Sequence, residues 1–175
     1  MNIVDGLAAV SQIVKRCIRE EMVSGGLLEE VETFIPAYQN DEPIEEPAIW
    51  LFEHETLPVE NEGRLSRNMT LRTPFEFVCL VYNSDSLEES ELKGKELAGK
   101  VAASIGKNFT RVDDNGNRIS SKPILDGFYP MGTVSINDSS DRAVITSVKI
   151  IIEYNVDWVI SCINKNNNND DGDNE

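Results

Sequence analysis

The chain has a single histidine, His54, and it lies between Glu53 and Glu55. Imidazole and carboxylate groups together carry proton transfer and metal binding in many enzymes. These three residues, however, follow a short apolar run and stand at its polar end, which favours a solvent-exposed histidine. The sequence also has no Gly-x-Ser-x-Gly, Walker or dinucleotide-binding motif. We therefore expect neither enzymatic activity nor a bound cofactor or metal ion.

A second group with possible chemistry is the oxygen-rich segment 113–117, Asp-Asp-Asn-Gly-Asn. Its alternating oxygen ligands are reminiscent of a calcium loop. An EF-hand loop that began at Asp113 would need Gly at its sixth position and Glu at its twelfth, where the chain has Arg118 and Ile124. The segment instead predicts a tight turn.

The three cysteines, Cys17, Cys79 and Cys162, are far apart and each lies in an apolar pattern. Neither a disulfide framework nor a metal site follows from such spacing. We expect small buried side chains in a reducing compartment.

Acidic residues dominate the charge, and they are concentrated in one segment. The 175 residues include 31 acidic and 16 basic side chains, for a net charge of −15. Residues 20–62 hold 13 of the acids and no Lys or Arg, while the other 132 residues hold 18 acids and 16 bases. Such a field repels nucleic acid and anionic lipid. The segment is either a solvated, loop-rich face or an acidic surface that attracts a basic partner or keeps DNA from adhering.

The length and apolar content favour one domain with a substantial core. We place this domain at residues 1–163 and expect the Asn- and Asp-rich residues 164–175 to form a disordered tail. The start of the chain lacks the pattern of a secretory signal, and no apolar run is long enough to span a bilayer. We expect an intracellular protein.

The first half of the chain predicts one helix and three strands. Apolar residues at three- and four-residue steps indicate an amphipathic helix over residues 3–22, ended by Gly25-Gly26. Looser alternation predicts a strand within residues 27–38. The apolar run 47–52 and the longer segment 69–82 predict two strands buried on both faces.

The second half predicts a helix followed by antiparallel strands. Ser86 and Glu89 form a capping box for a helix that runs to about Asn108, with a row of small and medium apolar residues that permits close packing. Residues 109–120 resemble a hairpin, residues 122–129 are ambiguous, and residues 132–137 and 142–156 predict two strands. The fold class is therefore α+β, with a mainly antiparallel sheet, two helices on one face and a β-hairpin.

This order of elements resembles the tail terminator proteins of long-tailed bacteriophages, also described as tail completion or head-to-tail joining proteins. The resemblance rests on the N-terminal helix, the strand that opens Pro47-Ala48-Ile49, and the strand 70–82 that leads into a helix beginning Ser90-Glu91-Leu92. The closing amphipathic strand 145–154 completes it. Together these segments cover roughly residues 3–156.

The resemblance implies a subunit that assembles as a hexameric ring on the tail tube, ends tube polymerisation and presents its other face to the head connector. The implied partners are a second copy, the tail tube protein and the head completion or connector protein. DNA would pass through the lumen without specific binding, and residues 20–62 could line it. The implied location is the virion, at the tail and neck, with the host cytoplasm during assembly.

Candidate contact residues follow from charge. Basic residues Arg64, Arg67 and Arg72 can pair with acidic residues of a neighbouring subunit, namely Glu42, Glu45 and Glu46. The equally weighted alternative is that these arginines are solvated or pair within one chain. The candidate contact with the tube or neck is the turn formed by Asp114, Asn115, Gly116 and Asn117.

Other functions stay open at this point. The chain could be a head completion or neck protein or a tail tube subunit, which would polymerise into long tubes. A further alternative is an acidic inhibitor that mimics DNA, although here the carboxylates cluster in turns. A small enzyme is the least favoured of these alternatives.

Overall fold

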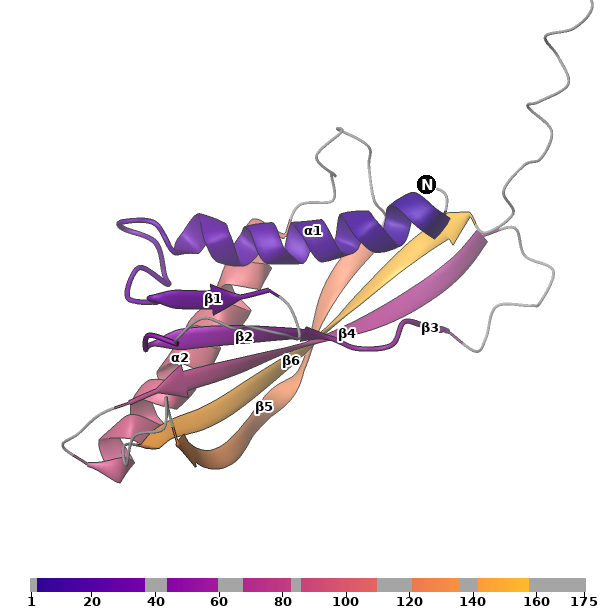
Figure 1. Cartoon of the computed structure of the whole chain (residues 1–175). Coiled ribbons are helices and arrows are strands. Elements are labelled where there is room, and N and C mark those ends of the chain that lie inside the picture. Colours follow the sequence, from indigo (N-terminus) through magenta and orange to yellow (C-terminus); the bar gives the residue numbers. More distant parts are fainter. Residues whose placement is uncertain are drawn as a thin grey trace, which may run out of the picture.

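The computed structural model describes residues 3–36, 44–59, 68–82, 86–109, 121–135 and 142–157 of the chain. Two helices and six strands make up an α+β fold (Figure 1). In chain order these elements are α1 (Ile3–Glu21), β1 (Thr33–Ile35), β2 (Ala48–Glu53), β3 (Leu57–Pro58), β4 (Asn68–Val81), α2 (Leu87–Asn108), β5 (Ser121–Ser135) and β6 (Arg142–Asp157).

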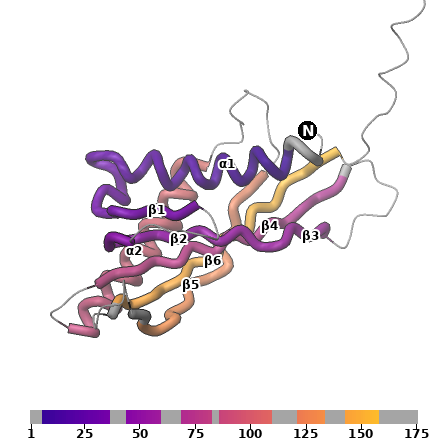
Figure 2. The backbone as a smooth tube through the Cα atoms, in the orientation of Figure 1, coloured from indigo at the N-terminus to yellow at the C-terminus, as the bar shows by residue number. Residues whose placement is uncertain are grey.

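The strands form one sheet with the order β1-β2-β4-β6-β5, and the short β3 pairs with β4. The β1–β2 pair is parallel and every other pair is antiparallel. Strands β4 and β6 pair without interruption from Asn68 opposite Asp157 to Val81 opposite Val144. In Figure 2, β5 runs along the outside of the sheet beside β6. The two edges of the sheet are therefore β1 and β5.

Both helices cover the same face of the sheet. Alternate residues of the central strands, such as Phe75, Phe77 and Val148, are fully buried. They belong to one apolar cluster with Cys17 of α1 and Ala98 of α2. The predicted class, a mainly antiparallel α+β fold with both helices on one face, is confirmed.

The second face of the sheet has no helix over it in the described part of the chain. Trp50, Phe52 and Val78 project from this face and remain partly exposed, and the Trp50 and Phe52 rings stack with centroids 5.2 Å apart. The prediction that segments 47–52 and 69–82 are buried on both faces therefore holds only at one end of these strands, where Ala48 and Leu80 are buried in a second cluster with Ala143. Apolar run length predicted a covered strand, but one layer of helices covers only one side.

The start and the packing of α2 follow the sequence pattern. Ser86 is the N-cap and its hydroxyl accepts a hydrogen bond from the Glu89 N–H at 3.0 Å. A Cβ added to Gly94 would lie 3.0 Å from Thr146 Oγ1 of β6, so α2 approaches the sheet closely at this point. The row of small residues thus packs against the sheet as expected.

Three segments either differ from the prediction or lie at least partly outside the residues that the structure describes. The sequence predicts a strand within residues 27–38. Of its described part, residues 27–36, only Thr33–Ile35 form a strand, because turn hydrogen bonds such as Leu28 N–H to Glu21 O hold the preceding residues. Residues 121–135, assigned as ambiguous or split, form one strand with irregularities at 125–127 and 130–132. Of the predicted hairpin only Phe109 is described, and residues 110–120 and the tail 164–175 lie outside the described residues.

Two of the three cysteines can be placed. Cys17 and Cys79 are free and fully buried, as expected. Burial raises the pKa of both thiols to about 12, so neither forms a reactive thiolate near neutral pH. Cys162 lies outside the described residues.

One carboxylate joins the ends of the two helices. Glu21, the last residue of α1, is almost fully buried. It accepts hydrogen bonds from Asn108 Nδ2 at 2.6 Å, Lys107 Nζ at 2.8 Å and the Leu27 N–H at 2.9 Å. The hydrogen bonds from Asn108 and Lys107 are the main causes that lower the pKa of Glu21 to about 2.

We predict that Glu21→Gln lowers the melting temperature near neutral pH and that the difference from the wild type shrinks in acid. Because the folded-state pKa of about 2 lies below the ordinary value of 4.5, the carboxylate stabilises fully above about pH 4.5 and loses this effect as the pH falls toward 2. Thermal denaturation across this range is the measurement. Glu32→Gln, at an exposed residue of the same connection, should leave the pH dependence unchanged. A constant difference at every pH would contradict the assignment.

We also predict opposite effects for the same substitution at two glycines of α2. Gly94→Leu should lower the free energy of unfolding by about 1–3 kcal/mol, because the new side chain meets Thr146 and Val144 of β6. An added Cβ at Gly99 meets no atom within 4 Å. Gly99→Leu should therefore raise stability by up to about 1 kcal/mol through helix propensity. Urea denaturation measures both, and equal effects would show that α2 does not approach β6 closely.

Candidate functional site

The uncovered face of the sheet holds a polar cluster around Glu76 of β4. His54 Nε2 lies 3.0 Å from Glu76 Oε2, the Ser147 hydroxyl donates to Glu76 Oε1 at 2.8 Å, and Lys149 Nζ lies 3.6 Å from Oε2. Burial raises the pKa of Glu76, but the hydrogen bonds from Ser147 and His54 outweigh it and the net shift is downward. The carboxylate is therefore held ionised by side chains from two neighbouring segments, the residue after β2 and strand β6.

A second carboxylate on the same face repeats this arrangement. Glu153 of β6 accepts from Lys122 Nζ of β5 at 3.0 Å and from Arg72 Nε of β4 at 2.8 Å. The hydrogen bond from Lys122, followed by that from Arg72, lowers the pKa of Glu153. Beside it, Lys149 Nζ lies 5.2 Å from the centroid of the Tyr129 ring. These contacts link the three strands β4, β6 and β5 across the uncovered face.

The polar groups on this face join neighbouring strands through hydrogen bonds and ion pairs. His54 was the first candidate in the sequence for proton transfer or metal binding. It pairs with Glu76 and is partly exposed. Within the described ranges no group of three His, Cys, Asp or Glu side chains is close enough to hold a metal ion. Neither described helix is long and apolar enough to cross a membrane.

Strand β5, at the edge of the sheet, carries more exposed large apolar side chains than any other described strand. Within seven residues of β5, Leu125 is 53% exposed, Phe128 47%, Tyr129 40% and Met131 57%. Among described strands β5 pairs only with β6. A long edge strand that exposes apolar side chains readily associates with another chain. We call these four residues the β5 edge cluster.

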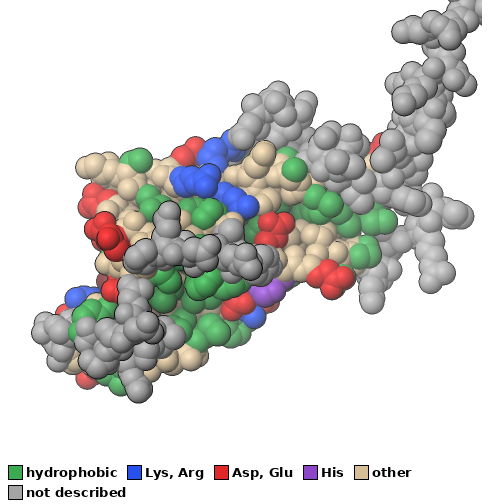
Figure 3. Space-filling model, in the orientation of Figure 1, with side chains coloured by type: hydrophobic (Ala, Val, Ile, Leu, Met, Phe, Trp, Pro, Cys, Tyr) green, Lys and Arg blue, Asp and Glu red, His purple; other side chains and the backbone are tan. Residues whose placement is uncertain are grey.

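Basic side chains form a patch over α1. Figure 3 shows Lys and Arg side chains gathered over α1, whose basic residues are Lys15, Arg16 and Arg19, and acidic side chains toward its C-terminal end. Arg19 also lies with its guanidinium carbon 5.8 Å from the centroid of the Phe34 ring. The acidic segment therefore begins directly beside a basic patch, and the surface offers both signs to a partner.

Only part of the predicted contact set can be placed. Arg64, Arg67, Glu42 and the turn Asp114, Asn115, Gly116 and Asn117 lie outside the described residues. Arg72 is described and pairs with Glu153 of its own chain. Its guanidinium-bearing side chain is still half exposed, so a further contact with a neighbouring subunit stays a prediction.

The structure does not bring Arg72 near the predicted acidic partners within one chain. Glu45 donates its backbone N–H to Thr33 Oγ1 at 3.0 Å, and Glu46 precedes β2, whose first residue Ala48 pairs with Leu80. Leu80 lies eight residues beyond Arg72 along β4, or about 26 Å at roughly 3.3 Å per residue. Contact between these charges would have to join two copies.

Sequence reasoning missed the β5 edge cluster. Pro123, Gly127, Pro130 and Gly132 interrupt the pattern and made residues 122–129 ambiguous. Proline is tolerated at sheet edges and at bulges, and glycine often marks bulges. Strand β5 fits this rule, because its pairing with β6 is irregular at residues 125–127 and 130–132. The signal was the density of apolar residues between these breakers, which typifies an edge strand and not a loop.

We predict that Ser147→Ala is costly because it removes a donor from the ionised Glu76. Both Ser147 and Ser104 are fully buried, but Ser104 donates only to the Lys100 carbonyl of its own helix. Ser147→Ala should lower the free energy of unfolding by about 1.5–3 kcal/mol, the range for hydrogen bonds to charged groups. The matched control Ser104→Ala should change it by about 0.5 kcal/mol or less. Urea denaturation at neutral pH checks both, and equal losses would contradict this role of Ser147.

Neither a family model nor a curated protein matches the sequence. Among solved structures, the fold is similar to that of the bacteriophage SPP1 gp17 protein, with 14% sequence identity and a TM-score of 0.38. The similarity covers 81% of this chain and 89% of that chain. It is a remote likeness to a phage protein, and the function is argued below from the surfaces of this chain.

Proposed function

We propose that the chain is a non-catalytic structural subunit of a long-tailed bacteriophage, a tail terminator. In this proposal six copies form a ring on the end of the tail tube, stop its polymerisation and present the opposite face to the head connector. The virion is then its final location. The proposal rests on the resemblance of the element order and on one feature of the structure, the β5 edge cluster.

The β5 edge cluster is the main support for the proposal because exposing its apolar side chains to water is energetically unfavourable in an isolated chain. Leu125, Phe128, Tyr129 and Met131 are each 40% or more exposed and follow one another along a free edge. Burial of such side chains contributes about 25 cal/mol for each Å² removed from water. A subunit that assembles gains this free energy when the side chains are buried at an interface. An enzyme with a buried site does not require such exposed apolar side chains.

The asymmetry of the sheet suits a ring. Its two edges, the short parallel β1 and the long β5, are different surfaces, and a contact between different surfaces is repeated around a ring when the rotation closes. The described part of the acidic segment carries nine carboxylates and no Lys or Arg. Six copies of it facing a central channel would repel the DNA backbone and let DNA pass without adhering.

The acidic-mimic alternative is less well supported by the contacts of the carboxylates. A mimic presents carboxylates to solvent in place of phosphates. Glu21, Glu76 and Glu153 instead accept hydrogen bonds from donors of their own chain. Among phage parts, the alternatives of a tube subunit and a head completion protein are separated from a terminator by the experiment below.

The direct test is electron microscopy of the tail tube protein of the same phage, polymerised with and without the purified chain. We expect shorter tubes that carry a six-fold ring at one end. Tubes that lengthen by taking up the chain would instead identify a tube subunit. Tubes that stay unchanged while the chain binds the head connector would identify a head completion protein.

The β5 edge cluster provides the matched variants. Leu125→Asp combined with Met131→Asp should abolish rings and restore long tubes, because two charges would be placed in the apolar interface. Leu92→Asp changes a side chain of α2 that is 61% exposed, more than either, and should leave capping intact. Circular dichroism checks that all variants fold. Capping that survives in the double variant would contradict the role of this edge.

A further inference from the structure

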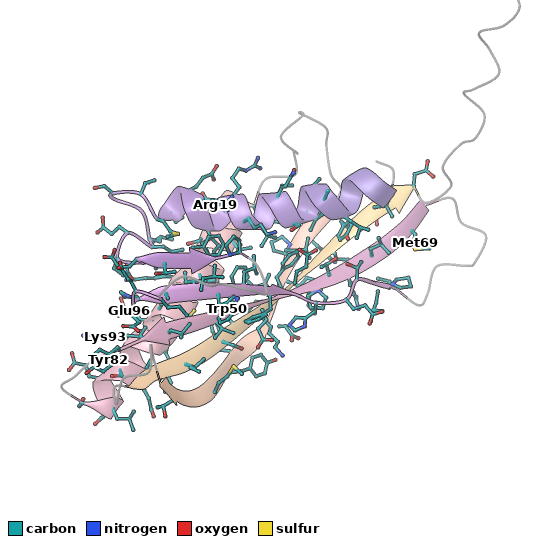
Figure 4. The ribbon with its side chains drawn as sticks, in the orientation of Figure 1. Arg19, Trp50, Met69, Tyr82, Lys93 and Glu96 are labelled. Carbon is teal, nitrogen blue, oxygen red and sulfur yellow. The ribbon has the colours of Figure 1, made fainter. Side chains whose placement is uncertain are left out.

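A cavity of about 420 Å³ lies at one end of the sheet and is open to solvent. The connection after α1, the residue before β2, the end of β4 and the middle of α2 all contribute to its lining. Its apolar part is formed by Pro47, Val81, Tyr82 and Leu97. Figure 4 shows Tyr82, Lys93 and Glu96 together at this end, with Met69 at the opposite end of the molecule.

Both lysines of the cavity lining are paired with carboxylates, and Glu29 accepts a hydrogen bond from the Gly25 N–H at 2.8 Å. Lys100 Nζ lies 2.6 Å from Glu30 Oε1 and 3.1 Å from Glu96 Oε1, and Lys93 pairs with Glu89 at 3.2 Å. The hydrogen bond to Glu30 is the main cause that raises the pKa of Lys100. The rim therefore does not require a charged ligand, and the apolar lining fits an uncharged, apolar segment.

The chain itself contains a segment of this chemistry next to the last described residue. Residues 158–163 read Trp-Val-Ile-Ser-Cys-Ile and follow Asp157, the end of β6. No other stretch outside the described residues has a comparable apolar run. Beyond residue 163 the chain is almost entirely Asn, Asp and Gly, so the apolar stretch has a defined end.

This segment cannot reach the cavity of its own chain. Val81 at the cavity pairs with Val144, whereas Met69 pairs with Val156 at the opposite end of β6. The two ends lie twelve residues apart along β4, or about 40 Å at roughly 3.3 Å per residue. Six residues that start from Asp157 span at most about 20 Å even when fully extended. The cavity of a second copy has no such restriction.

We infer that residues 158–163 of one copy occupy the cavity formed by Pro47, Val81, Tyr82 and Leu97 of the next copy. This contact joins the end of one molecule to the opposite end of another, which is the head-to-tail geometry that closes into a ring. The inference rests on the proposed ring and adds a second connection to it, distinct from the β5 edge cluster. Each subunit then gives one segment and receives one.

The first experiment measures the contact without a ring. The full chain with Trp158→Asp and Ile160→Asp, which disables its own segment, is titrated with a fluorescent peptide of residues 157–166 carrying Cys162→Ser. We expect saturable binding by fluorescence anisotropy. Adding Tyr82→Glu to the protein should weaken it by about tenfold or more, and Val23→Glu, at an exposed residue away from the cavity lining, should not. Absent binding at millimolar protein, or binding indifferent to Tyr82→Glu, would overturn the inference.

The second experiment mixes two full-length variants and weighs the product by native mass spectrometry. Trp158→Asp with Ile160→Asp retains the cavity, and Tyr82→Glu retains the segment. Neither variant alone should form a ring, and the mixture should contain a one-to-one dimer that neither variant gives alone, since one cavity and one segment remain. Rings formed by the segment variant alone would overturn the inference and leave the proposed function standing. A wild-type chain that never caps tubes would instead remove the proposed function while the peptide result stands.

Discussion

The placement of both helices on one face of the sheet is the constraint on which the other features depend. Phe75 and Phe77 of the central strand meet α1 and α2 in a single core, and Glu21 fastens the end of α1 to the end of α2. Close packing at Gly94 keeps α2 against β6. Since this one layer holds the core, no described helix covers the second face, and among the described strands β5 pairs only with β6.

Much of this fold can be predicted from the sequence because its signals are local. The periodicity of residues 3–22, the Ser86 cap and the alternation in residues 142–156 correspond to α1, α2 and β6. The errors came from tertiary context. Apolar run length cannot show that Trp50 and Phe52 have no helix above them, and turn hydrogen bonds replace a strand before Thr33. Edge position is what permits Pro123 and Pro130 within β5.

The candidate surfaces were less predictable than the fold, since they depend on which side chains remain uncovered. Charge alone left open whether Arg72 pairs with a neighbour's glutamate or within its own chain, and the register of β4 and β6 places it beside Glu153 of its own chain. The β5 edge cluster and the cavity at Tyr82 arise only when distant segments meet. The first surface is apolar and the second combines apolar residues with paired charges. Both lie at ends or edges of the sheet, where assembly into a ring would bury them.

Hydrogen exchange measured by mass spectrometry, on the free chain and on the chain bound to tail tubes, tests the central claim most directly. The claim is that assembly uses the free β5 edge. It predicts slower exchange in Ser121–Ser135 on binding, with little change in the central strand Asn68–Val81, which is paired on both sides in the free chain. Tube-bound chain whose exchange in Ser121–Ser135 equals that of the free chain would contradict the account.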